Sequence, residues 1–120
     1  MLRELRDVRQ IAGESLRRCF SDATMDLTVW VDASGGITGF ELCYDKENAE
    51  RALRWIRGEG FDHKRVDDGE QSPWDNLTPI LIPDGVFPAK EISRLFEENS
   101  REIDRSIADF VFRKLLDYPE

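Results

Sequence analysis

The chain has 120 residues, of which 40% are hydrophobic and 35% charged, and its formal net charge is −8. This length fits a single domain with a buried core, and the hydrophobic fraction excludes a disordered chain. The negative charge argues against nucleic acid or an anionic membrane as a partner, because both are bound through Lys and Arg. The sequence contains neither a run of ~18 apolar residues nor a secretion signal, so we expect a cytoplasmic protein.

The N-terminal half predicts a series of β-strands. Two short strands are expected at residues 7–11 and 16–20, on either side of an AGES turn. The clearest signal is MDLTVWVDASGGITGFELCYD at residues 25–45, where apolar and polar residues alternate on both sides of SGG. Glycine tolerates the positive φ of a tight reversal, so this stretch predicts a β-hairpin.

The alternation also predicts the register of this hairpin. One face pairs apolar side chains across the turn as Met25–Tyr44, Leu27–Leu42, Val29–Phe40 and Val31–Thr38. The opposite face then places Trp30 over Gly39 and Thr28 opposite Glu41. A shift of one residue would set Leu27 against Glu41 and exchange the two faces, so we favour the first register.

Two further strands are expected in the middle of the chain, RALRWIR at residues 51–57 and FDHKRVDD at residues 61–68, joined by a GEG turn. Residues 67–78 are rich in Asp, Asn, Gly and Pro and predict a loop. After it, PILIP at residues 79–83 predicts a short edge strand, because prolines bound it.

Two helices are expected at the C-terminal end, at residues 88–99 and 104–117. Pro88 suits the first helical position, and Asp104 suits the N-cap of the second helix. Apolar residues recur at helical spacing in both, namely Ile92, Leu95 and Phe96, and then Ile107, Phe110, Val111 and Leu115.

The last helix has a wider apolar stripe than one contact surface needs, because Phe112 and Leu116 extend it. Either loops flank the helix on the sheet, or these residues form a partner or homodimer face. Because strands come first and helices last, the sequence predicts an α+β fold. We expect an antiparallel β-meander of four to six strands with two C-terminal helices packed on one face, in one domain of residues 1–120.

The only histidine, His63, lies in FDHKRVDDGE together with several carboxylates. One interpretation is a small hydrolase in which His63 acts as general acid or base with Asp67 or Glu70. The other is a histidine that is hydrogen-bonded on a sheet face. No nucleophile motif such as G-x-S-x-G surrounds a serine, and VDDGE lacks the spacing of a calcium loop. We therefore expect no metal and no cofactor.

The arginines suggest a binding surface. Arg supplies 13 of the 17 basic residues, and many fall in predicted strands. A guanidinium can hold a carboxylate or phosphate with two hydrogen bonds, so arginines on the sheet face away from the helices could line an anion site. Alternatively, they form cross-strand pairs with Glu and Asp.

Two tryptophans, Trp30 and Trp74, are expected away from the main core, where large aromatic residues often mark contact sites. The hypothesis is a non-enzymatic binding or interaction module for a small anionic ligand or a protein partner. Its contact surface would be the open sheet face and the loop at 67–78. The candidate ligand-binding residues are Trp30, Glu41, Arg54, His63, Arg65, Asp67 and Trp74.

Several stretches resemble a widespread family of small uncharacterised bacterial proteins of about the same length. They are VRQI, FSD, DLTVW, GFELCYDK, RALRW, GFDH, VDDGE, TPILIPDG and IADFV, spread over residues 8–112. The resemblance implies a complete stand-alone domain, and it implies no activity, substrate or cofactor. The family pattern has a tryptophan where Cys19 stands, which argues against a thiol mechanism. Cys19 and Cys43 are expected as reduced thiols, with a bridge between them as the alternative.

Overall fold

The computed structural model describes residues 1–46, 50–67, 80–83 and 87–119, with the backbone alone at 66–67 and 80–83. Six strands of four to eight residues form the sheet, and a two-residue strand extends its edge. The strands are β1 (Arg3–Glu4), β2 (Leu16–Ser21), β3 (Asp26–Val31), β4 (Ile37–Tyr44), β5 (Arg51–Ile56), β6 (Gly60–Asp67) and β7 (Ile80–Pro83). The helices are α1 (Ala89–Asn99) and α2 (Arg105–Leu116).

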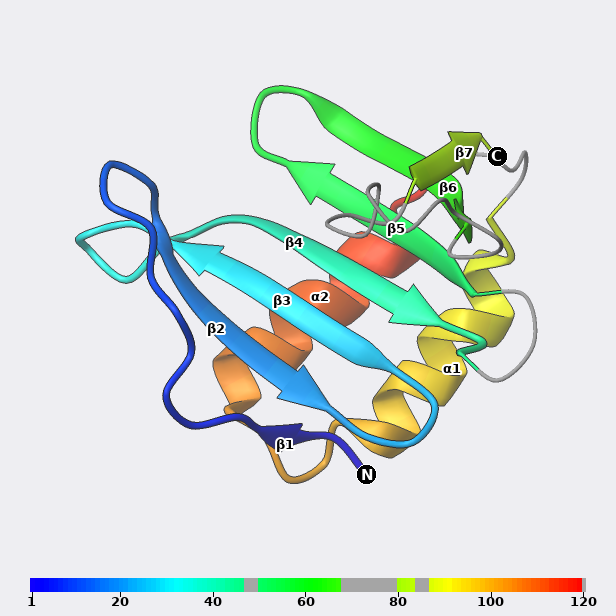
Figure 1. Ribbon diagram of the computed structural model, residues 1–120. Coiled ribbons are helices and arrows are strands. Elements are labelled where there is room, and N and C mark those ends of the chain that lie inside the picture. Colours follow the sequence, from blue (N-terminus) through cyan, green and yellow to red (C-terminus); the bar gives the residue numbers. More distant parts are fainter. Residues whose placement is uncertain (47–49, 68–79, 84–86, 120) are drawn as a thin grey trace, which may run out of the picture.

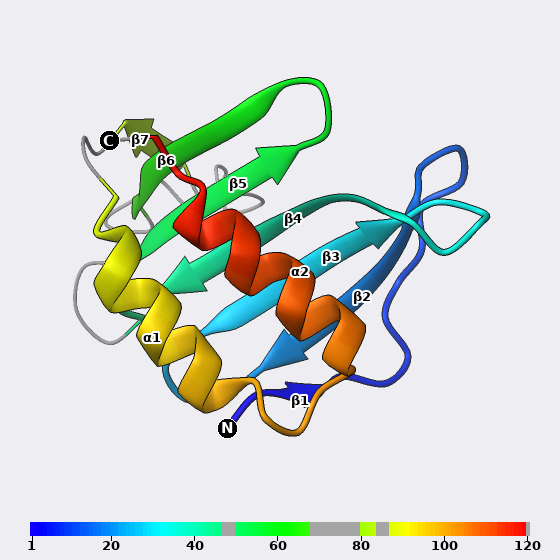
Figure 2. The ribbon, with the colours of Figure 1, turned by 180° about the vertical axis from the view of Figure 1, so that it is seen from behind.

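The sheet is an antiparallel meander in which each strand pairs with its neighbour in the chain, in the order β1 to β7. Figure 1 shows the sheet from one side with both helices behind it, and Figure 2 shows the two helices lying across the other side. The predicted α+β fold class is therefore confirmed. Neither described helix has the length and apolar character that crossing a membrane would require.

The pairing of β3 with β4 confirms most of the predicted hairpin register. Val29 pairs with Phe40, Leu27 with Leu42 and Trp30 with Gly39. The predicted Val31–Thr38 pair is wrong, because an irregularity between Trp30 and Val31 brings Val31 opposite Ile37. An extra residue on one strand shifts the pairing locally without exchanging the faces further along.

The turn of this hairpin is held by Asp32. Its Oδ1 accepts hydrogen bonds from the N–H groups of Ser34 and Gly36, each at 2.9 Å. Gly35 between them has a φ of 88°, which a side chain would disfavour. Hydrogen bonds from Ser34 and Gly36 also lower the pKa of the Asp32 carboxyl.

The core lies between the helices and one face of the sheet. Strand side chains that are almost fully buried there alternate along the chain, as expected for one face of a pleated sheet. They are Phe20, Leu27, Val29, Phe40, Leu42 and Leu53, and they pack with Ile92, Phe96, Ile107, Val111 and Leu115 from the helices. Leu95, predicted on the buried stripe of α1, is instead 40% exposed.

Asp104 lies at the predicted N-cap of α2, whereas Pro88, predicted at the first helical position, is the N-cap residue just before α1. Asp104 caps α2, and its Oδ1 accepts a hydrogen bond from the Ser106 N–H at 2.9 Å. Arg18 of β2 donates to Glu4 of β1 at 2.7 Å and lies 3.4 Å from Asp104. The hydrogen bond from Arg18 lowers the pKa of Glu4. This ion pair network joins the start of α2 to the β1 edge of the sheet.

The strand expected at residues 7–11 is not formed. Asp7 has a φ of 55°, which interrupts an extended strand, and the Gln10 side chain takes the place of a strand backbone. Its Oε1 accepts from the Arg17 N–H at 2.8 Å, and its Nε2 donates to the Arg17 carbonyl at 2.9 Å. A side-chain amide offers the same donor and acceptor as a peptide group, so it provides the hydrogen bonds that the backbone of β2 would otherwise lack at this position.

The close contact of β4 with β5 at Gly39 leads to a prediction. A Cβ at Gly39 would lie 2.7 Å from Ile56 Cδ1 and 2.8 Å from the Trp55 carbonyl oxygen. We expect Gly39→Ala to lower the free energy of unfolding by about 1–3 kcal/mol, as overpacking does. Urea denaturation of the two proteins measures this difference.

The direction of the change is decisive, because alanine at an unhindered strand position would instead raise stability by about 0.5–1 kcal/mol over glycine. Thr28→Ala, which removes atoms from the same face, serves as a control for changes at this face. A Gly39→Ala variant as stable as the natural chain would contradict the contact.

Candidate functional site: the open face of the sheet

The face of the sheet away from the helices carries three rows of side chains across β2–β6. The registers place Arg17, Trp30, Gly39, Ile56 and Gly60 in the first row, Cys19, Thr28, Glu41, Arg54 and Asp62 in the second, and Ser21, Asp26, Cys43, Ala52 and Lys64 in the third. Both described helices lie on the other side, as Figure 2 shows. We call these three rows the open face.

The centre of the open face is built on Trp30. Its cross-strand neighbour is Gly39, which lacks a side chain, and Ile56 lies on the far side of that glycine. The two larger side chains flank backbone that glycine leaves bare. The Arg54 guanidinium lies over the Trp30 ring, 5.7 Å from its centroid. Trp30 is half-buried, so part of the indole remains accessible.

Three of the predicted candidates meet here, namely Trp30, Glu41 and Arg54. Arg54 Nε donates to Glu41 Oε2 at 2.9 Å, and its Nη2 lies 2.8 Å from the same oxygen. Because an ion pair this exposed stabilises a fold by only about 0–1 kcal/mol, its main effect is to hold the guanidinium against the ring. The cross-strand Arg–Glu pairing that the sequence offered as one alternative is therefore present.

Most charges of the open face are compensated locally. Lys46, just after β4, pairs with Asp26 at 3.0 Å, and Lys64 pairs with Asp62 at 2.9 Å. Arg17, next to Trp30 in the first row, enters no ion pair with any described residue. The open face thus combines an accessible indole, an aliphatic neighbour and one cation available to an anionic partner.

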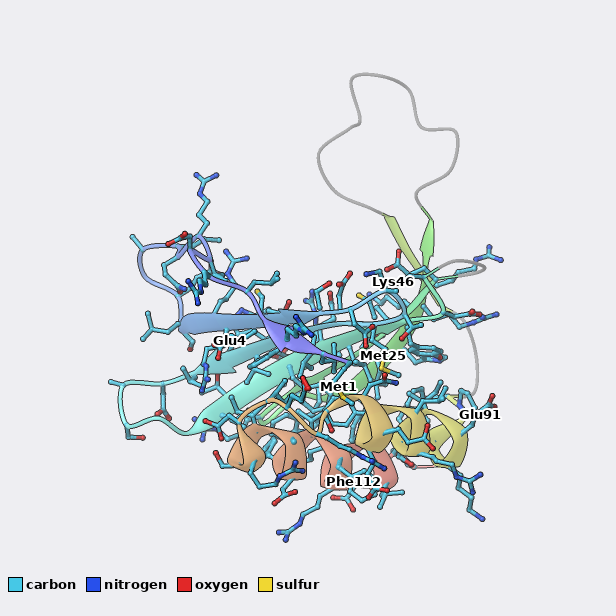
Figure 3. The ribbon with its side chains drawn as sticks, turned by 90° about the horizontal axis from the view of Figure 1, so that it is seen from below. Met1, Glu4, Met25, Lys46, Glu91 and Phe112 are labelled. Atoms are coloured by element: carbon cyan, nitrogen blue, oxygen red, sulfur yellow. The ribbon has the colours of Figure 1, made fainter. Side chains whose placement is uncertain are left out.

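The chain segment between β1 and β2 borders this face. Figure 3 shows that it rises from the sheet on the side opposite the helices. The Gln10 hydrogen bonds to the Arg17 backbone attach it to β2, and the Leu5 N–H donates to the Cys19 carbonyl at 2.8 Å. The β2 end of the first row therefore lies beside residues 6–14.

The two cysteines are free thiols and lie on the open face. Cys19 Sγ is 3.8 Å from the Thr28 hydroxyl. Burial raises the pKa of the Cys43 thiol to about 12, and the carboxylates of Glu41, Glu50 and Asp26 act in the same direction. Cys43 is therefore a neutral thiol at physiological pH, which does not suit a nucleophile.

His63 and Arg65 do not lie with Trp30, and this placement corrects the sequence interpretation. His63 pairs with Leu53 and Arg65 with Arg51, so both follow the alternation of the helix-covered face. The reason is the phase of β6, in which Phe61 opposite Trp55 sets the odd-numbered residues beneath the helices. His63 is only 7% exposed, whereas Arg65 is exposed near the end of its strand.

His63 is part of an aromatic cluster that the sequence did not reveal. Its Nε2 is 2.5 Å from the Tyr44 hydroxyl, and the two rings are nearly parallel with centroids 6.0 Å apart. Phe87 and Tyr118 contact the His63 ring edge-on at 5.3 and 6.5 Å. Both flank helix ends rather than lie within a periodic stretch, so no sequence pattern pointed to them.

Two arginines at the ends of β5 have partners within the fold. Arg57 lies 3.5 Å from Asp32, and Arg51 lies 3.6 Å from Asp45. Glu70, Trp74 and the rest of the predicted loop lie outside the described residues, as does the side chain of Asp67. Among the described residues, no three His, Cys, Asp or Glu side chains gather closely enough to hold a metal ion.

No protein-family model, curated protein or solved structure matches the chain. The resemblance to a family of small bacterial proteins therefore stays a prediction. What the protein does has to be inferred from the chemistry of its own side chains.

The raised pKa of Cys43 yields a prediction for thiol reactivity. In a Cys19→Ser variant at pH 8, we expect iodoacetamide to alkylate Cys43 at least ~100-fold more slowly in the folded protein than in the urea-unfolded chain, because only the thiolate reacts. As the pH rises above the ordinary thiol pKa of 9.0 and towards about 12, the alkylation rate of the folded protein should still increase, whereas that of the unfolded chain levels off. Mass spectrometry of quenched samples measures both rates. Equal rates at pH 8 would contradict the burial of the thiol.

Proposed function

We propose that the protein is a non-enzymatic binding module whose contact surface is the open face of the sheet. The observation that carries this proposal is the half-buried Trp30, held by Arg54 and flanked by Ile56, on a face that neither described helix covers. Aromatic and arginine side chains contribute disproportionately to binding energy at protein interfaces. The partner is a small anionic ligand or a protein.

The rigidity of the face supports this role. Its side chains project from five hydrogen-bonded strands, so a partner meets a preformed surface. The Arg54–Glu41 pair fixes a long side chain whose ordering would otherwise cost about 0.5–1.5 kcal/mol on binding. A surface arranged before the partner arrives loses less entropy when it binds.

The alternative is a small hydrolase in which His63 acts with Asp67 or Glu70, and the described geometry supports it less well. His63 is buried beneath the helices, and its Nε2 contacts the Tyr44 hydroxyl. Cys43 lies on the opposite face and is a neutral thiol. A general base must reach the proton that it removes, and a buried imidazole is far from solvent.

Two matched variants test the contact surface. Thr28→Glu places a longer, negatively charged side chain at the centre of the open face, where it repels an anionic partner, and Leu116→Glu places the same side chain, with the same charge change, on the half-exposed outer side of α2. We expect Thr28→Glu to abolish the association of the protein with its cellular partner and Leu116→Glu to leave it intact. Affinity capture with each variant, quantified by mass spectrometry, measures the difference.

If the variant of Leu116 loses the partner and the variant of Thr28 keeps it, the contact surface lies on the last helix instead. The homodimer that the sequence offers as an alternative for that helix is checked with the same proteins, because Leu116→Glu would then convert a dimer to a monomer in light scattering. Loss of the partner with both variants, each shown by thermal unfolding to be folded, would leave neither surface supported.

The hydrolase alternative makes a separate prediction. If the open face alone is functional, the natural chain and His63→Gln will hydrolyse p-nitrophenyl acetate at the same slow rate, because the imidazole takes no part. Removal of a general base that does act costs about 10²–10⁴-fold in rate. A loss of that size in His63→Gln, with the fold retained in circular dichroism, would favour the enzyme.

A further inference from the structure

The chemistry of the partner can be narrowed further, on the premise that the open face is the contact surface. Three cations at this face are already neutralised, since Lys46, Arg54 and Lys64 each pair with an acid. Arg17 remains, in the same cross-strand row as Trp30. Directly opposed side chains have Cβ atoms ~5 Å apart, so one ligand can contact both residues.

The N-terminal segment adds further positive charge beside Arg17. Residues 1–20 contain five arginines and three acids, and Arg18 is paired with Glu4. The four arginines that remain in residues 1–20, Arg3, Arg6, Arg9 and Arg17, are accompanied there by Asp7 and Glu14, so this stretch carries a formal charge of 4 − 2 = +2 in a chain of −8. No described acid forms an ion pair with any of these four guanidinium groups.

The position of this charge matters as much as its sign. The Gln10 side chain forms hydrogen bonds with the backbone N–H and carbonyl of Arg17. These bonds hold the segment against β2 at the residue whose side chain projects from the open face. Figure 3 places the segment on the side of the open face. Arg6 and Arg9 are exposed and belong to this segment. An anionic group that reaches Arg17 therefore lies next to the border that carries these arginines.

The size of the face favours an extended occupant. Five strands ~4.8 Å apart and six residues long at ~3.4 Å per residue give an area of at most roughly 20 Å by 20 Å, or ~400 Å², and Ala52 in the third row is itself buried. A stable interface between two folded proteins buries ~800 Å² on each partner. The open face is therefore small for a globular partner, but it matches a segment of about six extended residues, which spans ~20 Å.

We propose that the open face binds an extended acidic segment of a partner protein, with a carboxylate on Arg17 and an apolar or aromatic side chain on Trp30 and Ile56. Carboxylates of the segment beyond Arg17 face Arg6 and Arg9. A guanidinium suits a carboxylate because two parallel hydrogen bonds can form. A single-stranded nucleic acid is the less favoured occupant, because a net charge of −8 opposes a long polyanion.

The test uses a synthetic peptide, acetyl-Glu-Glu-Phe-Glu-Glu-amide, titrated into the ¹⁵N-labelled full chain at an ionic strength of ~0.1 M. We expect the amides of β2 and β3 and the indole N–H of Trp30 to shift, with a Kd below about 1 mM, an affinity of about −4 kcal/mol. Arg17→Glu should weaken binding at least ~10-fold, because it replaces attraction with repulsion. The corresponding lysine peptide should cause no shift.

Arg94→Glu on α1 is the matched control, because it makes the same charge change at an exposed site on the helix side. We expect it to alter the peptide Kd less than ~2-fold, since charges far apart are screened beyond ~10 Å in moderate salt. Equal weakening by Arg17→Glu and Arg94→Glu would overturn the proposal and indicate net charge alone. Tighter binding of a thymidine oligonucleotide with the same number of charges would overturn it in favour of nucleic acid.

Failure of this proposal can be distinguished from failure of the proposed function. If the peptide does not shift the open face while Thr28→Glu still abolishes partner capture, the acidic segment is wrong and the contact surface stands. If Thr28→Glu affects neither peptide nor partner, the contact surface itself is wrong, and the acidic segment fails with it.

Discussion

The register of β3 against β4 decides what each face of the sheet carries. Because successive strand residues point to opposite faces, pairing Val29 with Phe40 beneath the helices also fixes Trp30 over Gly39 on the other side. A slip of one residue would bury Glu41 and expose Leu42, which the core could not accommodate. The same register therefore determines both the packing of the core and the composition of the open face.

Charge compensation then determines what the open face can bind. A chain of −8 has acids available for almost every cation, and most arginines and lysines in the sheet are paired with one of them. Exposed pairs contribute little to stability, but each removes a cation from those that a partner could use. Arg17, the open-face cation without an ion pair to any described residue, lies at the β1–β2 edge beside Arg6 and Arg9, so the sign of the local surface there differs from the sign of the whole chain.

The parts of the fold set by periodicity were predictable from the sequence, and those set by single contacts were not. Alternation located the β3–β4 hairpin, and helical spacing with Asp104 located α2. The β-like residues at 7–11 do not pair, because the Gln10 side chain replaces the backbone, and no propensity reports such a substitution. His63 was predicted on the same contact surface as Trp30, and this placement is wrong, because the phase of β6 puts His63 opposite Leu53 on the covered face.

The covered and open faces also separate two kinds of polar chemistry. Leaving a buried imidazole or phenol without a hydrogen bond costs about 1–3 kcal/mol, so the contact between Tyr44 and His63 lets the aromatic cluster contain polar atoms at little cost. Phe87 before α1 and Tyr118 after α2 pack on the same ring, so His63 links β6 to both helices. His63, the only histidine of the chain, thus has a structural role that explains its burial. The open face is held by different contacts, Arg54 on Trp30 and Gln10 on Arg17, so a change in its binding residues need not disturb the core.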